Sequence, residues 1–464
     1  MRKAALAILI GIVLFSSCSR EVVSPHEPPW PDWAFSHWVW EDESTQQSAI
    51  ALVNGYLQRN IPVGAVIIDS PWETGYNTFE WDPVRYPDPP AMIKWFHERG
   101  VRVFVWTTSM INIGNAVEKA LHDEGSSKGY FMTAGQGMSP AIIDWWKGPG
   151  SFIDYFNPDA VAWWHSLMDK TLALGIDGWK VDFTDNDVFL APYSPYLKRN
   201  VQRLEYSHAY YRDFFTYTRE KLGRDRVITA RPVDAGGSLV SSMPVDLLES
   251  LLSYAPRDIN WAGWVGDQEG TFEGMKKALE NMLGSSRLNY IAFGSDIGGY
   301  NVVPAPGNLG REKELFIRWA QLGALCPVME NGGGGTHEPW KFDEYYGGTE
   351  TTDIYQSFVK LHYALIPYLM REGAWFWRGG ASLMRFVSAA DYQYRLGRDI
   401  FVAPILSPGG TVTVEFPKGS SWVYVFDRSR LYAGGTSQEL TFPLAEFPVY
   451  LRKGSIIEKT LIFQ

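Results

Sequence analysis

The chain has few cysteines, no cluster of basic residues and no long apolar run beyond its first residues. Only Cys18 and Cys326 occur among 464 residues, so no internal disulfide framework is expected. A net charge of −10 without a Lys/Arg cluster argues against a nucleic-acid partner. The sequence has no His/Cys cluster suited to a metal ion, so we expect neither a metal nor a cofactor.

Residues 1–18 are typical of a bacterial lipoprotein signal. Arg2 and Lys3 precede the apolar run Ala4 to Phe15, which is too short to span a bilayer. Small residues then precede Cys18, the expected site of lipidation, although an ordinary secretory signal is the alternative. We therefore expect a protein held in the bacterial cell envelope, in the periplasm or on the outer surface, with its lipid anchor as the only membrane contact. The proline-rich residues 19–32 are expected to form a tether.

From residue 33 to about 370, strand and helix patterns alternate, which is typical of a parallel α/β architecture. Eight strands in this span predict a (β/α)₈ TIM barrel. The expected strands are Trp33–Trp40, Gly64–Asp69, Val101–Thr107, Trp179–Phe183, Arg226–Ala230, Asn260–Val265, Asn289–Gly294 and Leu325–Met329. Long insertions follow the third strand (112–156) and the fourth (184–200), as in loops that build a substrate site.

Beyond the barrel, the pattern changes to short alternating apolar and polar runs separated by Gly, Pro and Ser turns. An example is Thr411-Val412-Thr413-Val414-Glu415-Phe416. Residues 375–464 are therefore predicted to form a C-terminal antiparallel β-sandwich.

Four predicted strands carry an aspartate at or just beyond their carboxyl ends, namely Asp69, Asp182, Asp267 and Asp296. Parallel strands of a barrel direct their carboxyl ends into one pocket, so the four acids should meet there. Crowding carboxylates costs electrostatic repulsion, which indicates a functional role.

Glycoside hydrolysis is the economical use of such a cluster. A retaining mechanism needs one ionised carboxylate as nucleophile and one protonated carboxyl as general acid. The high content of Trp (20), Tyr (24) and Phe (25) also suits a carbohydrate pocket, because aromatic rings stack on sugar rings. Arg231, after the fifth strand, would donate to a carboxylate or a hydroxyl, or else form a structural ion pair.

Several motifs then resemble glycoside hydrolase family 31, which includes α-glucosidases, α-xylosidases and α-galactosidases. Gly178-Trp179-Lys180-Val181-Asp182 resembles the nucleophile motif, and Trp264-Val265-Gly266-Asp267 resembles the acid/base motif. Ser295-Asp296-Ile297-Gly298-Gly299 and His337-Glu338-Pro339-Trp340 are similar to later signatures of the family.

The resemblance implies that Asp182 is the nucleophile and Asp267 the acid/base of a retaining, exo-acting α-glycosidase acting on a carbohydrate. It also implies a set of substrate-binding residues: Asp69, Trp106, Lys180, Arg231, Trp264, Asp296 and His337. The alternatives are a transglycosidase of the same family and a surface-anchored, non-catalytic sugar-binding protein.

Three features depart from the family pattern. The usual β-sandwich before the barrel is not expected in this chain. Asp185 stands where a glutamate is common, three residues after the nucleophile. The four-glycine run Gly332 to Gly335 predicts a mobile or open rim near His337. Sugar specificity is expected to depend on Trp72, Trp106 and the insertions.

Overall fold

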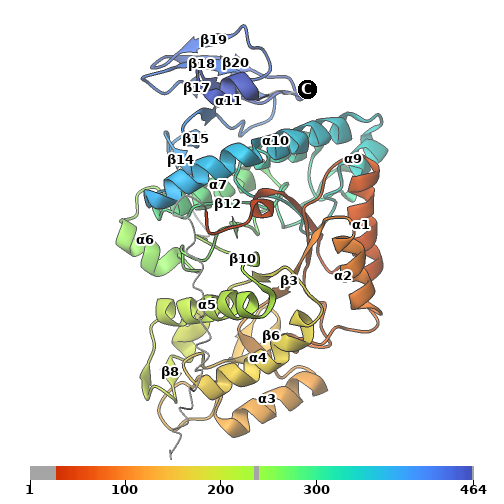
Figure 1. Ribbon diagram of the computed structural model, residues 1–464, viewed down its shortest axis with the longest axis vertical. Coiled ribbons are helices and arrows are strands. Elements are labelled where there is room, and N and C mark those ends of the chain that lie inside the picture. The colour runs from red at the N-terminus through yellow and green to blue at the C-terminus, as the bar shows by residue number, and fades with distance from the viewer. Residues whose placement is uncertain (1–27, 235–239, 462–464) are drawn as a thin grey trace, which may run out of the picture.

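A ring of short parallel strands forms the centre of the computed structural model, which describes residues 28–234 and 240–461 (Figure 1). Six strands pair in the order β10-β7-β3-β2-β1-β13, and β11 pairs with β12 in a separate parallel ladder. The strands are β1 (His37–Glu41), β2 (Ala65–Ile68), β3 (Arg102–Thr107), β7 (Gly178–Val181), β10 (Val227–Ala230), β11 (Gly263–Trp264), β12 (Phe293–Gly294) and β13 (Met329–Asn331).

Single contacts connect the two sheets into a barrel. On one side, Asp296 and Glu330 form an isolated parallel bridge between the end of β12 and β13. On the other side, Asn260 lies just before β11, and its side-chain Nδ2 donates to the carbonyl oxygen of Ala230 in β10 at 2.8 Å. The predicted (β/α)₈ barrel is therefore confirmed.

Four predicted strands begin later than expected, at His37, Gly263, Phe293 and Met329, and for the first and last of them the local reason is visible. Trp33 to Phe35, expected in the first strand, instead belong to the 3₁₀ helix η1 (Asp32–Phe35). The last strand begins at Met329 rather than Leu325, because Pro327 has no N–H to give to a ladder and residues 325–326 form a turn after helix α8.

Helices cover the outside of the barrel, and their starts follow ordinary capping rules. Thr45 and Ser48 form a capping box at α1, and Asp88 caps α2 with Pro89 in its first turn. The helices of the barrel region are α1 (Gln46–Gln58), α2 (Pro89–His97), α4 (Pro158–Leu172), α5 (Arg203–Leu222), α6 (Val245–Leu252), α7 (Phe272–Arg287), η3 (Pro306–Asn308), α8 (Lys313–Gly323), α9 (Pro339–Tyr346) and α10 (Glu350–Arg378).

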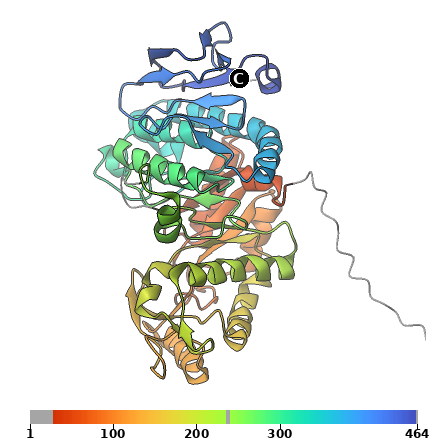
Figure 2. The same cartoon turned by 90° about the vertical axis from the view of Figure 1, so that its left-hand side faces the viewer.

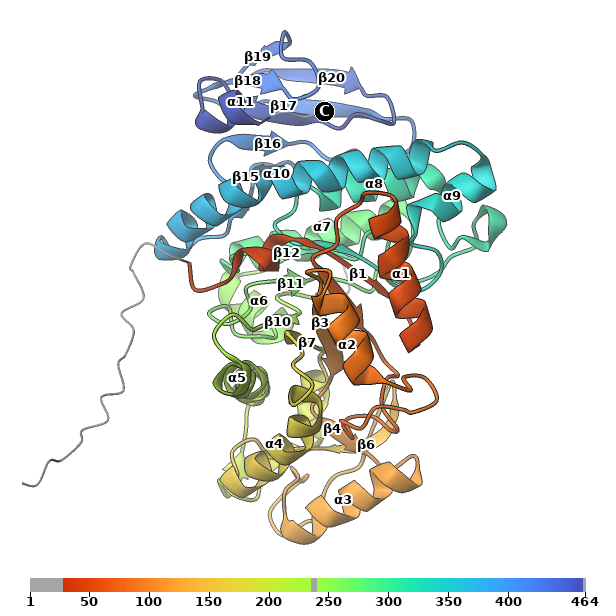
Figure 3. The ribbon, with the colours of Figure 1, turned by 45° about the vertical axis from the view of Figure 1, so that its right-hand side comes forward.

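The predicted insertions form structure of their own at the end of the molecule opposite the C-terminal strands (Figure 3). The first contains a three-stranded sheet and helix α3, and the second contains a 3₁₀ helix and a small hairpin. Their elements are β4 (Met110–Asn112), α3 (Ala116–Lys128), β5 (Ile143–Trp145), β6 (Gly148–Phe152), η2 (Asp185–Leu190), β8 (Tyr193–Ser194) and β9 (Arg199–Asn200).

The C-terminal part consists of two antiparallel sheets, in agreement with the predicted β-sandwich. One has the order β14-β15-β16-β21-β18-β19, and the other is the pair β17-β20. The elements are β14 (Met384–Phe386), β15 (Tyr394–Leu396), β16 (Ile400–Val402), β17 (Thr411–Glu415), β18 (Ser421–Tyr424), β19 (Leu431–Ala433), β20 (Ser437–Thr441), β21 (Val449–Arg452) and α11 (Ile456–Thr460).

The C-terminal sheets lie above α10, at one end of the elongated molecule (Figure 2). Arg318 of α8 crosses this joint almost fully buried. Its guanidinium donates to the carbonyl oxygens of Phe442 (3.0 Å), Pro443 (3.3 Å) and Glu446 (2.7 Å). The barrel is therefore joined to the C-terminal domain partly through main-chain atoms.

No helix within the described ranges 28–234 and 240–461 is long and apolar enough to cross a membrane. The predicted signal, Cys18 and most of the predicted tether lie outside those ranges.

Candidate active site

A cavity of about 170 Å³ opens at the carboxyl ends of the barrel strands. Six of the nine residues predicted for the site line it, and they come from β2, β3, β7 and the segments after β10 and β11. The lining residues are Trp40, Asp42, Asp69, Ser70, Trp106, Trp146, Lys147, Lys180, Asp182, Phe183, Arg231, Asp267 and Tyr300.

Asp182 directly follows β7 and is held rigidly. Its Oδ1 accepts the N–H of Phe183 at 2.8 Å and Nε–H of Arg231 at 3.0 Å. Its Oδ2 accepts the indole N–H of Trp106 at 3.2 Å. Because its side chain is only 11% exposed and three donors face it, the direction of this carboxylate is fixed.

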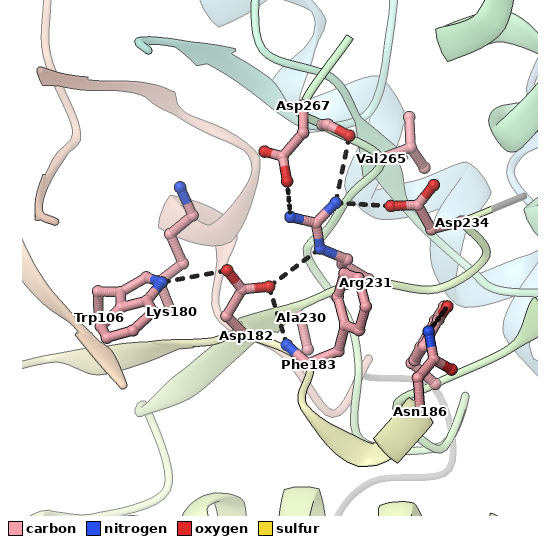
Figure 4. A network of polar contacts seen from close by, with 12 residues as sticks. Trp106, Lys180, Asp182, Phe183, Asn186, Ala230, Arg231, Asp234, Val265 and Asp267 are labelled. Carbon is pink, nitrogen blue, oxygen red and sulfur yellow. Dashed lines mark hydrogen bonds and ion pairs between the residues drawn. The ribbon is translucent and has the colours of Figure 1, made fainter. Parts of the chain in front are cut away.

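Arg231 links Asp182 to Asp267 (Figure 4). Besides its bond to Asp182, the guanidinium donates Nη2–H to Oδ2 of Asp267 and Nη1–H to Asp234 at 2.6 Å. The arginine is almost completely buried, and the three carboxylates around it raise its pKa far above the usual value. A permanent cation thus lies between the two carboxylates that the sequence pointed to.

Asp267 differs from Asp182 in environment. Its side chain is 46% exposed, against 11% for Asp182. Its position in the pocket nevertheless raises its pKa by desolvation, with the Arg231 charge opposing this rise and the Asp182 charge adding to it. Two nearby carboxyls with different surroundings suit an acid and a nucleophile.

A second ion pair forms the other wall of the pocket. The Lys180 ammonium donates to Oδ2 of Asp69 at 2.9 Å and lies 3.5 Å from the ring centre of Trp40. Nearby carboxylates, with Asp69 first among them, raise the pKa of Lys180 despite its burial. The charged lysine and Asp69 offer a fixed donor and acceptor to hydroxyl groups.

Behind this wall lie two fully buried carboxyls, Asp296 and Glu330. Neither oxygen of Glu330, nor Oδ1 of Asp296, has a hydrogen-bond partner among the described residues. Burial raises the pKa of Asp296 to about 7 and that of Glu330 to about 8, although the Lys180 charge opposes both shifts. The two form a layer of buried carboxyls beneath the pocket.

Three predicted substrate-binding residues do not lie on the pocket wall: Trp264, Asp296 and His337. The ring of Trp264 is fully buried between Lys180 (5.0 Å) and Arg231 (4.8 Å). The ring nitrogens of His337 face the carbonyls of Ile297 (3.0 Å) and Gly334 (3.1 Å), and burial holds its pKa well below the usual value. In this structure these three side chains therefore do not face the cavity.

The four-glycine run, expected to form a mobile or open rim, is closely packed at its first two residues, whereas Gly335 is exposed. Gly332 and Gly333 are buried, and a Cβ at Gly332 would collide with the ring of Trp40. The amide of Gly334 donates to the carbonyl of Tyr300 at 3.0 Å. The glycines allow close packing of the backbone against aromatic rings.

Some of the residues predicted to set sugar specificity line the pocket and others are buried behind it. Trp106 lines the pocket, whereas Trp72 is buried behind it and donates to the Trp106 carbonyl at 2.8 Å. The insertion supplies Trp146 and Lys147 to the rim. Asp185 is fully buried and pairs with Arg203 at 2.9 Å, so it supports the loop.

Sequence reasoning missed several lining residues. Trp40 is the last residue of a predicted strand, and the four acids also lie at or near strand ends. That position was the one signal in the sequence that Trp40 could face the pocket. Asp42 and Tyr300 approach each other from distant parts of the chain, with the Tyr300 hydroxyl 3.3 Å from Asp42 Oδ2. Nothing local in the sequence indicates that contact.

In the part of the chain that the structure describes, no group of three or more His, Cys, Asp or Glu side chains is arranged to hold a metal ion. The arrangement offers two central carboxyls, a bridging cation and a hydroxyl-binding pair. It can place a nucleophile and a proton donor at one bond of a polar ligand.

Family comparisons match both parts of the chain. The model described as "Glycosyl hydrolases family 31 TIM-barrel domain" matches residues 27–372, and that described as "Glycosyl hydrolase family 31 C-terminal domain" matches residues 384–457. Together they span most of the chain.

Individual relatives are distant. An α-xylosidase of Emericella nidulans is 27% identical over 455 residues, covering 92% of this chain and 53% of the relative. The α-xylosidase XylQ of Lactiplantibacillus pentosus is 28% identical over 454 residues, covering 92% and 54%. The chain thus spans about half the length of these curated relatives.

A solved structure of similar fold is a soil-metagenome α-xylosidase described as complexed with xylose. It has a TM-score of 0.74 and 22% identity, and the match covers 94% of this chain and 65% of that one.

Proposed function

The chain belongs to glycosyl hydrolase family 31, and from that premise we propose that it is a retaining, exo-acting α-glycosidase that removes terminal α-linked sugars from oligo- or polysaccharides. The observation that carries the proposal is the bridge from Asp182 to Asp267 through one guanidinium. Retaining enzymes hold their two carboxyls about 5–5.5 Å apart, and inverting ones about 6.5–9.5 Å. A bridge through neighbouring nitrogens of Arg231 favours the shorter separation.

Each acid suits one role. Asp182, fixed by three donors, attacks the anomeric carbon and forms the glycosyl–enzyme bond. Asp267, whose pKa is raised, protonates the departing oxygen and then deprotonates the water that releases the sugar. Asp69 and Lys180 bind hydroxyls of the sugar in the pocket.

Exo-action is supported by the shape of the site. The buried side chains of Trp40 and Lys180 line the cavity on the side of the barrel core, so we infer that a chain does not pass through it. A terminal sugar unit fits this geometry, and the rim residues Trp146 and Phe183 remain for the leaving group. The names of the relatives favour testing α-xylosides first.

The test is hydrolysis of aryl α-xyloside, α-glucoside and α-galactoside, with the anomer of the first-formed product followed by NMR. We expect release of the α-anomer by the wild type and none by Asp182→Ala. First formation of the β-anomer, or equal activity of the variant, would overturn the mechanism. Products carrying the sugar on an added acceptor would assign transglycosylation instead, and no release from any glycoside would leave only sugar binding.

We also propose that lipidation of Cys18 holds the protein in the bacterial cell envelope. The support is the order of charged, apolar and small residues before Cys18 in the sequence.

A further inference from the structure

Asp267 has an unusual backbone conformation for a residue proposed to donate a proton. Its φ is +73°, in the left-handed region that L-residues other than glycine rarely adopt. Such conformations persist only where the surroundings impose them, and they gather at functional sites. The contacts that impose this one can be identified.

Side chains hold the peptide groups on both sides of Asp267. Its backbone N–H donates to Oδ2 of the buried Asp296 at 3.2 Å. Its carbonyl oxygen accepts from Nδ2 of Asn301 at 2.6 Å. The two contacts fix the direction in which the Asp267 side chain leaves the backbone.

The residue before Asp267 shows how closely Asp296 approaches this turn. A Cβ at Gly266 would collide with Oδ2 of Asp296, so only glycine allows the carboxylate to reach the amide. Asp296 is completely buried and does not line the pocket, so its carboxylate faces the Asp267 backbone and not the cavity. Its position is explained by the backbone of Asp267.

We propose that Asp296 and Asn301 are positioning residues for proton donation, because they hold the Asp267 backbone so that its carboxyl faces the departing oxygen. This inference rests on the proposed function, in which Asp267 is the general acid and base.

The charge of Asp296 adds to its geometric role. The Asp267 charge contributes to the raised pKa of Asp296, and the same interaction works in reverse. A negative Asp296 therefore opposes loss of the Asp267 proton while its oxygen holds the amide. Glu330 lies in the same buried layer, but no hydrogen bond connects it to Asp267 in the described residues.

Comparing substrates with different leaving groups distinguishes a positioning role from general support of the fold. A sugar leaving group needs a proton, whereas an activated aryl group with a low pKa departs without one. A variant that misplaces the acid therefore loses activity mainly on disaccharides. A variant that only loosens the fold loses the same factor on both substrates.

The experiment measures kcat/KM of Asp296→Ala, Asp296→Asn and Asn301→Ala on a disaccharide and on an activated aryl glycoside. General acid catalysis contributes about 10²–10⁴-fold, so we expect Asp296→Ala to lose about 10- to 100-fold on the disaccharide and little on the aryl glycoside. Asp296→Asn keeps an oxygen acceptor and should lose less. Asn301 is exposed, so Asn301→Ala should fold normally and show the same substrate dependence.

Glu330→Gln is the matched control, because it alters a buried carboxyl of the same layer without a contact to Asp267. Any loss in this variant should be equal on both substrates. Equal losses on both substrates in Asp296→Asn and Asn301→Ala would overturn the inference, as would a leaving-group dependence in Glu330→Gln.

Asp267→Ala is measured alongside to separate the two proposals. If it shows leaving-group dependence and the positioning variants do not, the proposed function stands and this inference fails. If Asp267→Ala loses activity equally on the disaccharide and on the aryl glycoside, Asp267 is not the general acid, and both the proposed function and this inference fail.

Discussion

Asp182 and Asp267 accept hydrogen bonds from the same guanidinium group, that of Arg231. The two carboxylates are thus held on one side of the pocket by a cation that is almost completely buried. The arginine serves geometry and charge at once: it offers fixed donors to both acids and balances their repulsion.

Arg231→Lys should keep the charge but lose this geometry. A hydrogen bond to a charged group contributes about 1.5–3 kcal/mol, so loss of one such bond should lower kcat/KM by about 10- to 100-fold. Steady-state kinetics on an aryl glycoside check this. Wild-type kinetics would remove the bridge from the mechanism.

Asp267→Ala should accumulate a covalent intermediate on an activated aryl glycoside, because water lacks its base in the second step. Mass spectrometry should find the sugar on Asp182. Azide needs no general base, so it should speed turnover and give the α-glycosyl azide, the anomer that double displacement at an α-glycoside requires. Recovery of the β-azide would contradict the retaining assignment.

The alkaline limb of the pH–rate profile should depend on the leaving group. Asp267 must be protonated to donate, and its raised pKa extends the active range upward before activity falls as the proton is lost. We expect this fall in kcat/KM on a disaccharide and a weaker one on an activated aryl glycoside. Profiles of identical shape for both substrates would argue against Asp267 as the acid.

Asp177 should matter for stability and not for chemistry. It is buried at the start of β7, where it accepts from Arg102 and the backbone of Val103 and lies 2.7 Å from His97. Burial raises its pKa, but these contacts outweigh burial and hold the pKa below its usual value. Its partners Arg102 and His97 are 35% and 37% exposed and stay solvated, so Asp177→Ala should cost about 1.5–3 kcal/mol of unfolding free energy at neutral pH.

The pH dependence gives this prediction a second readout. Because the folded pKa of Asp177 is depressed, its contribution is present above the unfolded pKa and is lost as pH falls through the folded one. The difference between wild type and Asp177→Ala in urea unfolding should therefore shrink in acid. The exposed Asp144→Ala is the control, and an equal loss there would refute the special role of Asp177.

If Cys18 carries the anchor, Cys18→Ala should release the protein from membranes or block its processing. Fractionation of expressing bacteria checks this. An unchanged membrane fraction in the variant would rule out lipidation at Cys18.

Features carried by one short stretch of chain were predictable from sequence. The glycines around the apolar residues before Asp182 mark a buried strand, and the order of such stretches indicates a barrel. The same reasoning brought Asp69, Asp182 and Asp267 to one pocket, and their catalytic and binding roles stay predictions.

Features that depend on side-chain direction were not predictable. Trp264 lies beside the acid motif, yet its ring is buried between two cations, because adjacency along a two-residue strand does not set which way a ring points. Glu330 lies between Met329 and Asn331 in the sequence, and its nearness to Lys180 arises only when β13 pairs with β1. Trp40 lies near the end of β1, so the same pairing of β1 with β13 places it at the pocket.

The contact of Arg318 with the C-terminal domain has a consequence for recombination. This arginine recognises the carbonyl oxygens of residues 442, 443 and 446, which every amino acid supplies, and not their side chains. This contact therefore depends on the path of one loop and places little demand on its sequence. A chimera that exchanges the strands after Arg378 for those of a distant relative should keep this contact wherever the loop follows the same path, whereas the side-chain pairs Arg398–Glu372 and Tyr392–Glu280 would have to be carried over residue by residue.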